Sequence, residues 1–82
     1  MKLWLLIPIG DIETPSNRWY GVYDMAHGFV VRAENERQAR EFAASQAGDE
    51  GKEAWTDTTL SECVGLTEDG QPGVIMRDFS AA

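Results

Sequence analysis

The sequence of 82 residues contains a single cysteine, Cys63, and a single histidine, His27. One cysteine excludes an intramolecular disulfide and favours a reducing compartment, so we expect a cytoplasmic protein. One cysteine and one histidine form no zinc site without carboxylate ligands. The sequence also lacks a glycine-rich phosphate loop and the alternating oxygen ligands of a calcium loop. We therefore predict that the protein binds no metal and no cofactor.

Long apolar runs and positive charge are scarce as well. The longest apolar run, residues 3–9, is too short to span a bilayer, and it lacks the cleavage site of a signal peptide. Seven Lys and Arg residues stand against 14 Asp and Glu residues, which gives a net charge of −7. We therefore expect no membrane association and no direct binding of nucleic acid through a basic surface.

The residues that are present predict one domain spanning residues 1–82. The run from Phe29 to Ala33 is rich in β-branched residues, as expected of a strand. Helical spacing of small and apolar residues then predicts a helix over residues 36–47, with Asn35 as its cap, Gln38 in the capping-box position and Gly48 at its end. The stripe expected to face the core consists of Ala39, Phe42, Ala43, Gln46 and Ala47.

Three further strands are predicted. Residues 2–8 are apolar on both faces and therefore belong inside a sheet. Residues 61–66 and 74–79 would be joined by a loop with a hairpin signal, Asp69-Gly70. Residues 18–24 fit an edge strand or an ordered loop, and residues 57–60 fit a helical turn or the start of the next strand. The fold class is therefore α+β, with a mainly antiparallel sheet of about three to five strands and one helix packed on one face.

Catalytic groups are almost missing from this chain. A general base needs a partner within hydrogen-bond reach, and His27 lies alone in a predicted turn. Cys63 lies within a predicted strand, where a buried cysteine usually behaves as a small hydrophobic residue. A small enzyme that pairs Cys63 with His27 is conceivable, although their spacing gives it no support. We predict that the protein is not an enzyme and has no catalytic residues.

The distribution of acids is the main functional signal. Residues 49–82 carry a net charge of −6, whereas residues 1–48 carry −1. If the acids share one face, that face would attract a basic surface over a long range. An aromatic side chain among them would be the anchor of the contact. The candidate partner-binding residues are Asp49, Glu50, Glu53, Trp55, Asp57, Glu62, Glu68 and Asp69.

An alternative stays open for these residues. Trp55 would belong to the core beneath the helix, and the acids would be solvated loop residues that serve solubility. Binding would then use apolar surface, either the edge formed by Trp19, Tyr20 and Tyr23 or an exposed sheet face. The protein would be a monomer or a homodimer.

Four stretches of the chain resemble a family of short uncharacterised proteins from bacteria and their phages. They are residues 1–6, 28–34, 46–51 and 73–79. The resemblance carries no catalytic motif. In size and acidity the chain is also similar to phage-encoded inhibitors of host defence, including anti-CRISPR proteins, some of which mimic DNA with an acidic surface. This likeness implies a non-enzymatic inhibitor that blocks the basic, nucleic-acid-binding surface of a host complex.

Overall fold

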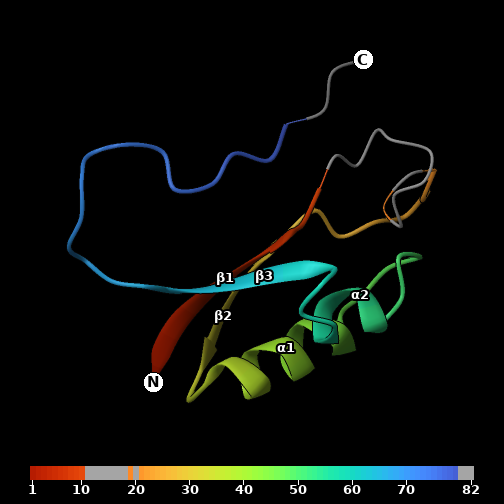
Figure 1. Ribbon diagram of the computed structural model, residues 1–82, viewed down its shortest axis with the longest axis horizontal. Coiled ribbons are helices and arrows are strands. Elements are labelled where there is room, and N and C mark those ends of the chain that lie inside the picture. Colours follow the sequence, from red (N-terminus) through yellow and green to blue (C-terminus); the bar gives the residue numbers. More distant parts are fainter. Residues whose placement is uncertain (11–18, 20, 80–82) are drawn as a thin grey trace.

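The computed structural model describes residues 1–10, 19 and 21–79. In these residues the elements are β1 (Lys2–Pro8), β2 (Phe29–Ala33), α1 (Glu36–Ser45), α2 (Glu53–Thr56) and β3 (Ser61–Leu66). The strands form an antiparallel sheet in the order β2-β1-β3 (Figure 1). The predicted α+β class is confirmed, and the single-turn helix α2 is an addition to it.

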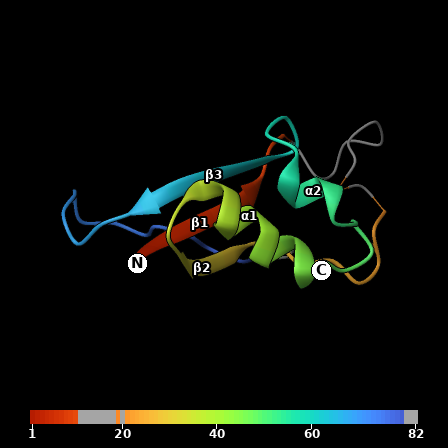
Figure 2. The same ribbon diagram turned by 90° about the horizontal axis from the view of Figure 1, so that it is seen from below.

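Strand β1 lies in the middle of the sheet, as its two apolar faces predict. Leu6 is opposite Phe29 on one side and Cys63 on the other, and these side chains face the helices, on what we call the first face. Leu5 alternates to the opposite face, which we call the second face. Both helices lie on the first face of the sheet, and Figure 2 looks at the sheet through them.

Helix α1 begins as predicted but ends earlier. The Asn35 Oδ1 accepts a hydrogen bond of 2.8 Å from the Gln38 backbone N–H. The Gln38 Oε1 reaches back to the backbone N–H of Glu34 at 2.8 Å, one residue before the position that a capping box uses. The helix ends at Ser45, and Gly48 has no positive φ angle, so the prediction that Gly48 terminates it is wrong.

The buried stripe of α1 is rotated from the predicted one. Phe42 is half exposed, whereas Arg40 and Ala44 are buried together with two of the predicted alanines. Small side chains allow the helix to lie close to the sheet, and the large rings of the core come from elsewhere. Trp55 contacts Trp19 and Phe29 edge to face, with ring centroids 5.0 and 4.8 Å apart.

The structure decides between the two alternatives given for residues 57–60, and for the described part of residues 18–24. Residues 57–60 form a helical turn, in which the backbone N–H groups of Leu60 and Ser61 donate to the Asp57 carbonyl. Residues 21–24 form no strand, and Tyr23 is exposed while Trp19 belongs to the core. The predicted aromatic edge is therefore not formed by these two residues, and Tyr20 lies outside the described residues.

The prediction of a fourth strand is wrong. Residues 74–79 are not in a strand, and they cross the second face of the sheet instead (Figure 1). We call them the crossing segment. A strand needs a partner edge. In Figure 1 the chain turns out of the plane of the sheet after β3 and returns over its face, so residues 74–79 do not lie at a sheet edge. Met76 is held against Gly28, where a Cβ atom would collide with its methyl group.

Candidate interaction surface

Two of the predicted partner-binding residues are buried. Trp55 is 0% exposed, and Glu50 is 3% exposed. The Trp55 Nε1–H donates to the Glu50 carboxylate at 2.6 Å, and the Ala26 backbone N–H donates to it at 3.3 Å. Trp55 therefore belongs to the core, as the alternative interpretation expected, and neither residue offers surface to a partner.

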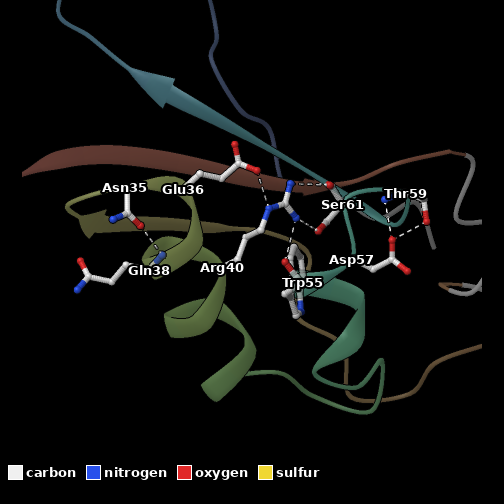
Figure 3. Close-up of polar contacts among 8 residues, drawn as sticks. All are labelled: Asn35, Glu36, Gln38, Arg40, Trp55, Asp57, Thr59 and Ser61. Carbon is white, nitrogen blue, oxygen red and sulfur yellow. Dashed lines mark hydrogen bonds and ion pairs between the residues drawn. The ribbon is translucent and has the colours of Figure 1, made fainter.

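Three other predicted residues lie at the surface around α2. Asp49 accepts a hydrogen bond from the Asp24 backbone N–H at 3.2 Å. Asp57 accepts from the backbone N–H and the hydroxyl of Thr59 at 2.8 and 2.6 Å (Figure 3). Glu53 is exposed at the first residue of α2. Asp49 and Asp57 therefore hold local turns in addition to carrying charge.

The remaining predicted acids lie elsewhere. Glu62 is near the start of β3 and opposite Ile7, so its side chain is on the second face. Glu68 and Asp69 follow the far end of β3. A strand of six residues is roughly 20 Å long. The structure therefore does not bring all the predicted acids together.

More than half of the net charge lies in what we call the helical layer, residues 34–60. This stretch carries seven acids and three bases, for a net charge of −4. Arg40 and Glu50 are its buried members, so the exposed charges also sum to −4. Two ion pairs along α1 neutralise part of this layer, Arg37 with Glu41 at 3.3 Å and Arg40 with Glu36 at 2.9 Å.

Arg40 is a key residue that sequence reasoning did not find. Its guanidinium donates to the Trp55 carbonyl at 3.0 Å and to the Ser61 hydroxyl and carbonyl at 2.9 and 3.1 Å. With Glu36 these partners use donors on all three guanidinium nitrogens (Figure 3). Arg40 therefore joins α1 to α2 and β3, which positions the acidic helical layer against the sheet.

Cys63 and His27 are not brought together. Cys63 packs under the helices on the first face, whereas His27 lies beside the crossing segment, with its Nδ1 4.0 Å from the Asp78 carboxylate. Burial raises the pKa of the Cys63 thiol, nearby Glu36 raises it further, and Arg40 opposes them. A thiol of this kind is less ionised at neutral pH than an ordinary cysteine, which is unfavourable for a nucleophile.

Neither metal ligands nor a membrane span emerge from the described residues. They contain no group of three or more His, Cys, Asp and Glu side chains that could hold a metal ion. No helix among them is long and apolar enough to cross a membrane. No protein-family model, curated protein or solved structure matches the chain.

Proposed function

We propose that this is a small, acidic, non-enzymatic interaction protein whose helical layer binds a basic surface on a protein partner. The observation that carries the proposal is the concentration of unbalanced negative charge on that layer, −4 over residues 34–60. Asp49, Glu53 and Asp57 are its predicted contact residues, while Trp55 and Glu50 support it from the core.

The partner that fits this surface is a cytoplasmic complex that binds nucleic acid. Such complexes have basic channels, and an acidic protein that occupies the channel blocks it by sterics and charge without any reaction. The resemblance to short phage proteins, and the similarity in size and acidity to anti-CRISPR inhibitors, support a role against host defence. In this role the protein imitates the charge of DNA.

The first test neutralises acids of the helical layer. Glu41→Gln, Asp49→Asn and Glu53→Gln remove three negative charges while keeping an acceptor oxygen at each position. The matched control, Glu62→Gln with Glu68→Gln and Asp69→Asn, removes three charges outside the layer. Both proteins are tagged and used to capture partners from host extract. We expect the first variant to lose at least about tenfold in affinity, a change of 1.4 kcal/mol, and the control to lose far less.

Equal losses in both variants would show that only net charge matters. Unchanged capture by the first variant would contradict binding through the helical layer. Asp57 is left intact in this design, because its carboxylate accepts two short hydrogen bonds that hold the turn at Thr59, whereas Asp49 accepts one long one, which the asparagine oxygen can keep. Glu50 is left intact because it is buried against Trp55.

A second candidate function is an accessory domain that acts through apolar contacts, with its acidity serving solubility. The observation that favours it is the exposure of large apolar side chains, among them Val30, Val74 and Ile75. The two functions differ in their response to salt, since an apolar contact survives the screening that weakens a charged one.

A further inference from the structure

The loop that joins β3 to the crossing segment, residues 67–73, contains the sequence Asp69-Gly70. Nowhere else in the chain does an aspartate or asparagine precede a glycine. Every residue of this loop is exposed, and the core residues that the structure describes all precede it in the sequence. A chemical change at this dipeptide therefore proceeds in the folded protein without any opening of the core.

The two groups that can react within an Asp-Gly dipeptide are both free in this loop. The Asp69 backbone carbonyl accepts a hydrogen bond from the Thr67 hydroxyl at 3.1 Å. The Asp69 carboxylate and the Gly70 backbone N–H have no hydrogen-bond partner in the described part of the chain. A Cβ atom at Gly70 would meet nothing within 4 Å, so no neighbour restricts the approach of the carboxyl group to the amide nitrogen.

The glycine distinguishes this aspartate from others at the surface. Gly70 has a φ angle of +151°, which L side chains rarely adopt, and without a Cβ atom it leaves its own amide nitrogen unshielded. Asp78 is also exposed, but the residue after it is Phe79, whose large side chain shields the amide nitrogen. The Asp57 carboxylate is held by hydrogen bonds from the backbone N–H and the hydroxyl of Thr59.

We propose that Asp69 isomerises spontaneously to isoaspartate in the folded protein. The Gly70 amide nitrogen attacks the Cγ atom of the protonated Asp69 carboxyl group. A bond between this nitrogen and Cγ forms while the bond between Cγ and the hydroxyl oxygen breaks. The hydroxyl group leaves as water together with the amide proton. The product is a five-membered succinimide ring.

Water then opens the ring at one of its two carbonyl groups. Opening at the side-chain carbonyl restores aspartate, whereas opening at the main-chain carbonyl leaves the backbone running through Cβ and Cγ. The water lost in the first step is returned in the second, and neither step needs an oxidant, a reductant or an enzyme. The isoaspartate keeps a free carboxylate, so the net charge is unchanged. The connection between β3 and the crossing segment becomes longer by one backbone atom.

The inference does not rest on the proposed function, because Asp69 lies outside the helical layer. Incubation of the purified protein at neutral pH and body temperature over several weeks tests it. A protease that cleaves before aspartate does not cleave before isoaspartate, so cleavage before Asp69 should decline with time while cleavage before Asp78 and Asp57 persists. The modified peptide should keep its mass and should accept a methyl group from S-adenosylmethionine in the presence of an isoaspartate carboxyl methyltransferase.

Two variants at the same position separate this chemistry from general degradation. Asp69→Glu keeps the charge but would have to form a less favourable six-membered ring, so the rate should fall at least about tenfold. Asp69→Asn loses ammonia instead of water and should react at least about tenfold faster, with a gain of one negative charge. The charge control described above contains Asp69→Asn and is therefore used freshly purified.

The same incubation in urea measures the rate in the unfolded chain. Because the reacting groups are exposed and free of hydrogen bonds, the rate in the folded protein should lie within about tenfold of that rate. Circular dichroism confirms that the protein without urea stays folded. A folded protein that keeps Asp69 intact while the unfolded chain isomerises would overturn the proposal. So would equal conversion in Asp69→Glu, or isomerisation of Asp78 as fast as that of Asp69.

Discussion

At the scale of single residues, Arg40 links three elements through its buried guanidinium. Replacing it with alanine would leave the Trp55 carbonyl and the Ser61 hydroxyl and carbonyl without this donor. Unpaired buried acceptors cost free energy, so we expect Arg40→Ala to lower the free energy of unfolding by about 2–4 kcal/mol. Urea denaturation monitored by tryptophan fluorescence measures the change.

Arg37→Ala is the matched control for Arg40, since it removes the same charge from the same helix. The Arg37 side chain is 90% exposed and pairs with Glu41. A surface pair of this kind contributes little, so the loss should stay within about 0.5 kcal/mol. Equal losses in the two variants would mean that charge on α1, and not the buried hydrogen bonds, explains the stability.

Cys63 gives a pH-dependent prediction at the same scale. Burial and Glu36 raise the pKa of its thiol in the folded protein. The thiolate is the reactive form, so labelling of the native protein should have its midpoint at a higher pH than labelling of the unfolded protein. The rate of modification by a thiol reagent, followed from about pH 7 to 10, measures both midpoints. A midpoint below that of the unfolded chain would revive the hypothesis of a nucleophilic cysteine.

At the scale of elements, Gly48 shows how the chain that follows α1 is positioned. It does not terminate the helix by a left-handed conformation, because its φ angle is not positive. A Cβ atom at this position would instead collide with the Asp24 carbonyl oxygen, which accepts a hydrogen bond from the Asp49 N–H at 2.6 Å. The chain after α1 is thus held against residue 24 by a contact that only glycine permits.

Gly48→Ala should therefore lower the free energy of unfolding by about 1–3 kcal/mol, because the backbone must move to admit the methyl group. The control is Gly73→Ala, where a Cβ atom would meet nothing within 4 Å and φ is not positive. That change should stay within about 0.5 kcal/mol. Thermal denaturation of both variants measures the difference. If Gly48→Ala is as stable as the wild type, the close contact with Asp24 does not form.

The elements that sequence alone predicts well are those whose signal is local. The bounds of β1, β2 and β3 follow from short apolar runs between turn residues, and the start of α1 follows from Asn35. The strand expected over residues 74–79 has the same composition, but a strand also needs a partner edge, which local composition cannot supply. Gly48 was interpreted as the residue that terminates α1, whereas the close approach of Asp24, which local sequence does not reveal, is what requires a glycine there.

At the scale of the whole molecule, the candidate site required knowledge of spatial neighbours. A helical pattern assigns an arginine to the polar, solvent-facing side. Arg40 is buried instead, because Trp55 and Ser61, which follow it by 15 and 21 positions in the sequence, provide acceptors for its guanidinium. Trp55 and Glu50 are residue types that suit an interface with a basic partner. In the structure both are buried and hydrogen-bonded to each other. The net charge of each stretch could be predicted, whereas its distribution over two sides of the sheet could not.

The central claim at this scale is that the two sides differ, with an acidic helical layer for a basic partner and exposed apolar side chains on the second face. The most direct test is capture of partners from host extract by the tagged wild-type protein, at low salt and at roughly 0.5 M salt, where the Debye length is about 4–5 Å. The account predicts a nucleic-acid-binding complex that is captured at low salt and lost at high salt. A partner that is retained equally at both salt concentrations would contradict binding through the acidic layer.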